Sequence, residues 1–181
     1  LLALIMIVGF GMHHPGGFDQ TFLQAVFRWM HVFFGILWIG IPMVHAVWLR
    51  ELPHGDGLVV DVLIGTFLGD TFAYFGGRLI GRHKMAPTTS PGKTWEGLVV
   101  GSLATVFVAF VALYKQDFLS IAESIVLGLV LVVAAPAGDL FESLLKRDMQ
   151  VKDTGRLLGG HGGVLDRVDA LLFAGPAAYF T

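Results

Sequence analysis

One segment of the chain gathers the residue types that hold phosphates and metal ions. It begins near Asp139, a carboxylate at the point where an apolar stretch ends. Four glycines surround a histidine at positions 159–163, which allows backbone amides to approach an anion closely. Asp166 and Asp169 follow one helical turn apart, a spacing that suits oxygen ligands of a hard cation such as magnesium. With lysines and arginines beside them, these residues predict metal-assisted phosphoryl or nucleotidyl transfer.

The first part of this segment is predicted to be a helix with one polar face. Four side chains fall at positions i, i+3, i+4 and i+7 of that helix, and these are Asp139, Glu142, Ser143 and Lys146. A carboxylate at the end of a membrane helix is costly unless it is paired or binds a cation. A surface ion pair of Lys146 with Asp139 or Glu142 is the alternative that needs no ligand.

A second polar segment begins with a carboxylate inside an apolar stretch. Asp70 is a functional candidate because ionisable groups within membrane helices are expensive to bury. An ion pair with Arg78 is the structural alternative, and Asp61 is a weaker candidate of the same kind.

Further along this segment, Gly92, Lys93 and Thr94 have the order of the end of a P-loop. That motif requires a glycine where Pro87 stands, and no strand is predicted before it, so we reject the P-loop. Ser90, Lys93 and Thr94 remain candidates for phosphate contacts in a loop. Anchoring at the membrane interface is the alternative for Lys93.

The elements that position these residues are predicted to be membrane helices. The chain has 181 residues, of which 55% are hydrophobic and only 14% charged, and its mean hydropathy is +0.72. Soluble domains carry about a quarter charged residues, so an ordinary soluble protein, a disordered chain and a basic nucleic-acid binder are excluded. The absence of cysteine excludes disulfides and thiolate metal sites. The predicted fold class is all-α, a polytopic integral membrane protein with active-site loops on its cytoplasmic face.

A spanning helix needs roughly 20 mostly apolar residues. Stretches of this kind occupy residues 29–49, 58–77, 97–114 and 121–138, and residues 1–12 resemble the remnant of another span. We predict a single membrane-embedded domain over 1–181, truncated at both ends. Within it, residues 1–69 form generic transmembrane helices, 70–169 the catalytic portion and 170–181 the start of a last span. Gly65 with Gly69, and Gly97 with Gly101, are spaced for close helix packing.

The basic residues are concentrated in two loops separated by two predicted spans. The first loop carries Arg78, Arg82, Lys84 and Lys93, and the second region carries Lys146, Arg147, Lys152, Arg156 and Arg167. Two spans return the chain to the side where it began, so both groups are predicted on one face. The bias of basic residues towards the cytoplasm assigns that face to the cytoplasm. We expect a multi-pass protein of a bacterial inner membrane, with its active site on that face.

Three stretches in the second region together resemble the signature of one family. Residues 143–147, 152–155 and 161–169 resemble phosphatidate cytidylyltransferases, also called CDP-diacylglycerol synthases. Residues 70–78 and 90–97 are similar to other stretches of that family, and the resemblance covers roughly residues 70–169.

The resemblance implies transfer of the cytidylyl group of CTP to phosphatidic acid, giving CDP-diacylglycerol and pyrophosphate. It also implies a magnesium requirement, with a second cation left open, in a bilayer, without nucleic acid and with a homodimer as a candidate assembly. The implied catalytic residues are Asp139, Asp166, Lys146 and Arg167, and the implied metal ligands are Asp139, Asp166 and Asp169. The implied substrate-binding residues are Ser90, Lys93, Thr94, Ser143, Arg147, Lys152, Asp153, His161, Gly162 and Gly163.

Two rival functions stay open at this point. The nearer is a CTP-dependent lipid kinase of the polyprenol type, or a cytidylyltransferase for another lipid phosphate; a transferase releases pyrophosphate and a kinase releases CDP. The remoter is a cation transporter that uses Asp61 and Asp70. A transporter predicts internal repeats, which the sequence does not show.

Overall fold

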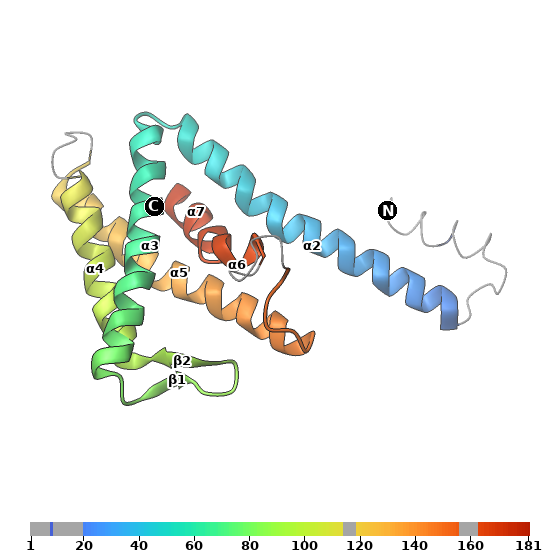
Figure 1. The fold of residues 1–181 in the computed structure, drawn as a ribbon. Helices are drawn as coiled ribbons and strands as arrows, with labels where there is room; N and C mark the ends of the chain where they lie inside the picture. Colours follow the sequence, from blue (N-terminus) through green and yellow to red (C-terminus); the bar gives the residue numbers. More distant parts are fainter. Residues whose placement is uncertain (1–7, 9–19, 114–118, 156–162) are drawn as a thin grey trace. The chain divides into compact units, whose positions relative to one another are not determined.

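The computed structural model of the chain describes residue 8 and residues 20–113, 119–155 and 163–181. Over these ranges the chain is helical apart from one small hairpin (Figure 1). It divides into two compact units, residues 1–41 and 42–181, and helix α2 (Gln20–Glu51) contributes residues to both. The polar contacts of the candidate site all lie within residues 42–181.

Three helices are long and apolar enough to cross a membrane, namely α2, α3 (Gly55–Ile80) and α5 (Ile121–Asp148). They contain the predicted spans 29–49, 58–77 and 121–138. Helix α4 (Trp95–Leu113) covers most of the predicted span 97–114 and is apolar. Its apolar part among the described residues is shorter than the length needed to cross a membrane. The all-α membrane fold is therefore confirmed, while the predicted remnant span 1–12 lies outside the described residues except for Val8.

Helix α5 is longer than the predicted span 121–138. It begins at a capping box, in which Ser120 Oγ accepts from the Glu123 amide at 3.3 Å and Glu123 Oε2 accepts from the Ser120 amide at 2.7 Å. It continues ten residues beyond the predicted end at Gly138, because its second half is amphipathic rather than apolar and buries Glu142. The predicted polar-faced helix through Asp139 and Lys146 is therefore the continuation of the predicted span 121–138.

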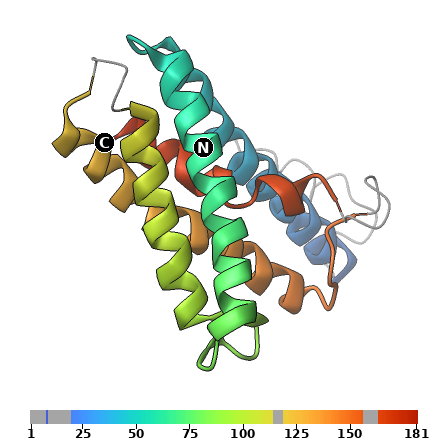
Figure 2. The same cartoon turned by 60° about the vertical axis from the view of Figure 1, so that its left-hand side comes forward.

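Helices α3 and α4 lie side by side at very short range (Figure 2). A Cβ added to Gly101 would lie 2.6 Å from the Gly69 carbonyl oxygen and 2.7 Å from Ala73 Cβ. A Cβ added to Gly97 would lie 2.5 Å from the Ala73 carbonyl oxygen. The predicted role of these glycines in close helix packing is confirmed.

The segment between α3 and α4 is a hairpin, whereas the sequence predicts a loop there. Strands β1 (Lys84–Ala86) and β2 (Ser90–Thr94) pair antiparallel, with Ala86 opposite Ser90. Strand β2 runs directly into α4, and Thr94 Oγ1 accepts from the Gly97 amide at 3.1 Å as the helix begins. The strand was missed because proline and glycine are unfavourable in strands. The P-loop stays rejected, since no glycine-rich loop separates β2 from α4 and Pro87 remains where a glycine is required.

The C-terminal part contains two short helices, α6 (Leu165–Val168) and α7 (Leu171–Tyr179). Alanines of α7 pack against leucines of α5 to form the buried core, with Ala174 and Leu131 fully buried. Helix α7 also contacts α3. This packing holds the turn between α6 and α7 against the middle of α5. That residues 170–181 begin a last span stays a prediction.

Candidate functional site

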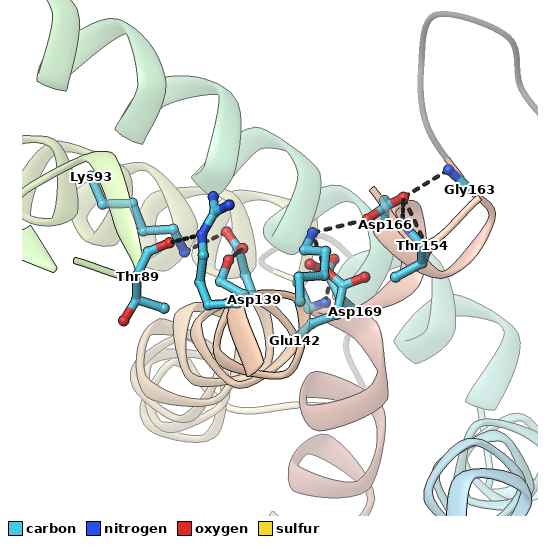
Figure 3. Close-up of polar contacts among 12 residues, drawn as sticks. Thr89, Lys93, Asp139, Glu142, Thr154, Gly163, Asp166 and Asp169 are labelled. Atoms are coloured by element: carbon cyan, nitrogen blue, oxygen red, sulfur yellow. Dashed lines mark hydrogen bonds and ion pairs between the residues drawn. The ribbon is translucent and has the colours of Figure 1, made fainter. Parts of the chain in front are cut away.

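Helix α5 carries two groups of polar contacts along one side, next to one another (Figure 3). We call the first the hairpin cluster; it consists of Thr89, Lys93, Asp139, Ser143 and Arg147. We call the second the loop cluster; it consists of Glu142, Lys146, Thr154, Gly163 and Asp166. The predicted polar face of this helix is thereby confirmed.

The centre of the hairpin cluster is an ion pair between strand β2 and helix α5. The Lys93 ammonium contacts Asp139 Oδ2, and Ser143 Oγ donates to Asp139 Oδ1 at 3.4 Å. The Lys93 and Asp139 side chains remain 22% and 29% exposed, so a ligand can reach both. Lys93 is therefore more than an interfacial anchor, because it joins two segments of the predicted site.

A second contact holds the hairpin against the end of α5. Arg147 Nε donates to the Thr89 carbonyl oxygen at 3.0 Å. The two basic segments therefore lie on the same side of the helices, as predicted from the number of spans between them. Through this hydrogen bond the Arg147 side chain holds the hairpin close to the predicted phosphate-binding residues.

The loop cluster is organised around the Asp166 carboxylate. Its Oδ2 accepts from the Thr154 amide at 3.0 Å, the Thr154 hydroxyl at 2.9 Å and the Gly163 amide at 2.7 Å. A Cβ at position 163 would lie 2.6 Å from Thr154 Oγ1, so a glycine is needed for this approach. Asp166 thus fixes the two ends of the glycine-rich segment in place.

Lys146 connects the loop cluster to the interior of α5. Its ammonium lies 2.6 Å from Glu142 Oε2 and 2.9 Å from Asp166 Oδ1. The Glu142 side chain is 1% exposed, so the predicted surface pair is in fact a buried one. The alternative partner Asp139 does not pair with Lys146; it pairs with Lys93. Removing one partner of a buried pair leaves an uncompensated charge and costs about 3–5 kcal/mol.

The carboxyl groups of Asp166 and Asp169 have opposite electrostatic surroundings. Burial disfavours ionisation of Asp166, but the Lys146 ammonium and the Gly163 and Thr154 donors outweigh it and hold the pKa below the usual range. Burial raises the pKa of Asp169, and the negative charge of Asp139 raises it further. Asp166 is thus a satisfied carboxylate, whereas Asp169 lacks sufficient positive charge nearby.

A close approach of two backbones brings Asp169 to helix α5. A Cβ at Gly138 would lie 2.5 Å from the Asp169 carbonyl oxygen, so only glycine allows the turn to pack here. The Asp169 side chain accepts from the Ala170 amide at 2.8 Å through Oδ1. Because Gly138 immediately precedes Asp139, this packing places the two carboxylates in the same region.

Asp70 joins this region from helix α3. It interacts electrostatically with Asp139, Lys93 and Asp169. The alternative ion pair with Arg78 is absent from the described residues, where Arg78 Nη1 instead donates to the Tyr74 hydroxyl at 2.9 Å. Asp61, the weaker candidate, is buried in α3 and is not among these contacts.

The donor chemistry of this region fits a hard divalent cation. Asp139 and Asp169 offer oxygen ligands, and the negative charge of Asp139 makes ionisation of Asp169 less favourable, which a cation between them would relieve. In the described part of the chain, no three acidic or histidine side chains converge closely enough to surround an ion. Magnesium commonly uses one or two carboxylates and completes its shell with water and substrate phosphates, so this sparse set is compatible with it.

The other predicted site residues are less closely joined to these clusters. Lys152, Asp153 and Arg167 are exposed, and Ser90 is half-buried in β2. Thr94 is buried, and its hydroxyl caps α4. His161 and Gly162 lie outside the described residues.

Sequence reasoning left three residues out of the predicted site. Glu142 was placed on the polar face, and its i,i+4 spacing from Lys146 is the signal that could have included it. Asp70 was singled out for its burial cost but not assigned a role. Thr154 gave no usable signal, because its contacts with Asp166 join residues twelve positions apart.

Comparison with known proteins identifies the family of this chain. A family model described as the cytidylyltransferase family matches residues 1–181, so the chain belongs to that family. It is 39% identical to a phosphatidate cytidylyltransferase of Haemophilus influenzae, over 97% of this chain and 62% of that protein. It is 34% identical to the uncharacterized protein YnbB of Escherichia coli K12, over 92% of this chain and 55% of that protein. The phosphatidate cytidylyltransferase of Rickettsia bellii is 34% identical over 98% of this chain and 78% of that protein.

Proposed function

We propose that this member of the cytidylyltransferase family transfers the cytidylyl group of CTP to phosphatidic acid, producing CDP-diacylglycerol and pyrophosphate. The observation that carries the proposal is the contact of Lys93 with Asp139, which joins the hairpin to α5 beside the loop cluster. Two segments that resemble the family signature in sequence thereby form one site. The relatives named phosphatidate cytidylyltransferase support the same substrate pair.

In the proposed reaction an oxygen of the lipid phosphate attacks the α-phosphorus of CTP. The new bond forms as the bond to the oxygen that bridges the α- and β-phosphates breaks, and pyrophosphate leaves with that electron pair. The lipid phosphate is already an anion near neutral pH, so the reaction needs no strong general base. Its main demands are to bring two polyanions together and to stabilise the charge on the leaving group.

The clusters supply groups suited to both demands. Lys93 is positioned to contact a phosphate at the hairpin, and Lys146 is held in place by Glu142 and Asp166. The exposed Lys152 and Arg167 can complete the neutralisation of the triphosphate. Asp166 holds Thr154 and Gly163 close to Lys146.

Magnesium is proposed as the cofactor, held by Asp139 and Asp169 with Asp166 next to them. When bound, it would neutralise negative charge on the phosphates. Coordination at Asp166 Oδ1 would compete with the present contact to Lys146 at 2.9 Å. The site is proposed to face the cytoplasm of a bacterial inner membrane, and a homodimer is the proposed assembly.

The direct test measures products from the full-length protein in detergent–lipid micelles with CTP, phosphatidic acid and magnesium. We expect equimolar pyrophosphate and CDP-diacylglycerol, dependent on both substrates and lost on chelation of the metal. The variants D139N and K93M should lower turnover at least about 100-fold, in the range seen when one charge-stabilising donor is removed. D148N, a change at an exposed position on α5, is the matched control. Release of CDP instead of pyrophosphate would show a lipid kinase and refute the proposal.

A further inference from the structure

The end of helix α3 carries cations that the two clusters do not use. Arg78 lies in its last turn, and Arg82 and Lys84 follow at the start of the hairpin; all three are exposed. Among the described residues, none of them forms an ion pair. The acidic residue across the hairpin, Glu96, is engaged by His83, with Nδ1 to Oε1 at 2.6 Å. This end of the helix therefore has an uncompensated positive charge.

One strip of helix α3 connects these cations to the site. Asp70, Tyr74 and Arg78 are spaced at i, i+4 and i+8, so they follow one another along a single ridge. Arg78 Nη1 donates to the Tyr74 hydroxyl at 2.9 Å, which directs the guanidinium along that ridge. Asp70, at the other end of the strip, interacts with Lys93 and Asp139. The backbone distance from Asp70 to Arg78 is about 12 Å at 1.5 Å per residue.

Apolar side chains flank the same end of the helix. Phe75, Leu79 and Ile80 are 52%, 80% and 56% exposed. In a membrane helix such side chains face lipid, and cations at the helix end lie at the level of the headgroups. The surface thus combines positive charge with an apolar flank, which matches a lipid that has an anionic headgroup.

We propose that Arg78, with Arg82 and Lys84, binds the phosphomonoester headgroup of the lipid substrate at the membrane interface, before the lipid moves along the strip to the site. This inference rests on the proposed function for the identity of the substrate. A phosphomonoester carries up to two negative charges and three terminal oxygens, whereas a phosphodiester lipid carries one charge. A set of two guanidinium groups and one ammonium group therefore favours the monoester.

The first experiment measures lipid binding without turnover. The full-length protein is placed in phosphatidylcholine nanodiscs that contain phosphatidic acid, and the lipid that stays bound is counted by native mass spectrometry. We expect R78A to weaken retention of phosphatidic acid about tenfold, as for loss of one charged hydrogen bond. R50A removes an arginine from the distant end of α2 and should leave retention unchanged. R78Q, which keeps a polar side chain but removes the charge, should behave like R78A if charge is the cause.

Phosphatidylglycerol is the competitor that distinguishes a monoester site from general attraction to anionic lipid. It should displace phosphatidic acid poorly. Equal displacement, or unchanged retention in R78A and R78Q, would overturn the inference and leave the basic residues a topological role alone.

The second experiment separates this inference from the proposed function. In steady-state assays, R78A should raise the KM for phosphatidic acid about tenfold and leave the KM for CTP unchanged, and R78K should recover part of the loss. A rise in the KM for CTP would overturn the inference, because Arg78 would then belong to the nucleotide site. If the wild type binds phosphatidic acid but shows no CTP turnover, the proposed function fails while the lipid site stands.

Discussion

Three aspartates of the site differ in what surrounds them. Asp166 accepts three hydrogen bonds at Oδ2 and an ammonium at Oδ1, and is the most fully satisfied. Asp139 pairs with one lysine and stays partly exposed, and Asp169 is buried beside the negative charge of Asp139. At the residue scale, Asp166 therefore holds Thr154 and Gly163 in place, whereas a bound cation would stabilise Asp139 and Asp169 more than Asp166.

The organising role of Asp166 is testable by replacement with asparagine. In D166N one acceptor oxygen becomes an amide donor and the negative charge is lost, so the side chain can no longer serve both Lys146 and the Thr154 and Gly163 donors. We expect faster amide hydrogen exchange at Thr154 and Gly163, together with a loss of turnover of about 100-fold or more. D148N serves as the control with unchanged exchange. Unchanged hydrogen exchange at both amides in D166N would contradict the role of Asp166 in holding Thr154 and Gly163.

The depressed pKa of Asp166 predicts how this contribution depends on pH. Its pKa in the folded protein is lower than the value of about 3.9 in an unfolded chain. The stabilisation is therefore fully present above the unfolded value and is lost as pH falls through the folded value. The difference in melting temperature between the wild type and D166N should be constant from about pH 8 to pH 5 and shrink below about pH 4. If the difference in melting temperature began to shrink near pH 6, a group other than the Asp166 carboxylate would be responsible.

At the element scale, the site depends on helix α5 and the hairpin being held together. The apolar length of α3 and α5 is readable from the sequence, because a bilayer of fixed thickness imposes it. The polar face of the second half of α5 is readable as well, from the spacing of Asp139, Glu142 and Lys146. The burial of Glu142 is not, because it depends on how distant parts of the chain pack. The contact of Lys93 with Asp139 is equally unpredictable, because it depends on how α3, α4 and α5 pack.

Residue type and local spacing identify which side chains belong to the candidate site, but not which of them pair. The sequence identified Asp139, Lys146 and Asp166 by type and spacing, and the structure places them in adjacent clusters. It could not assign Lys93 to Asp139, since local spacing carries no information about a pairing between separate elements.

Packing of α3 on α4 makes Gly101 a test at this scale. In G101A the new methyl group would clash with the Gly69 carbonyl oxygen, which cannot move without shifting the helix. We expect a loss of about 1–3 kcal/mol in the free energy of unfolding, measured by thermal or denaturant unfolding in detergent. In G40A no described residue lies within 4 Å of the new atom, so stability should be unchanged or slightly increased. Equal stability of the two variants would show that the helices can separate freely.

At the scale of the whole molecule, the chain is a set of membrane helices whose chemistry is concentrated at one end. The hairpin and the end of α5 meet there, while the turn between α2 and α3 lies at the other end of α3 (Figure 1). The chain spans 55% and 62% of the length of the first two relatives compared.

The absence of cysteine from the sequence allows this arrangement to be tested in membranes. Single substitutions Thr88→Cys and Val151→Cys should react alike with a membrane-impermeant maleimide, because both positions lie at the site end. Glu51→Cys at the end of α2 should react from the opposite side. In spheroplasts we expect labelling of position 51 alone, and in inverted vesicles labelling of positions 88 and 151. Labelling of 88 and 151 from different sides would contradict the fold.

The excess of acidic groups in the site has a consequence for the order in which ligands bind. Asp70, Asp139 and Asp169 together with the loop cluster place five carboxylates around the two ammonium groups of Lys93 and Lys146. These carboxylates would repel a bare triphosphate, and a cation bound with the nucleotide would remove that repulsion. Initial-rate kinetics should therefore show CTP entering as its metal complex, with free CTP acting as a weak competitor at most.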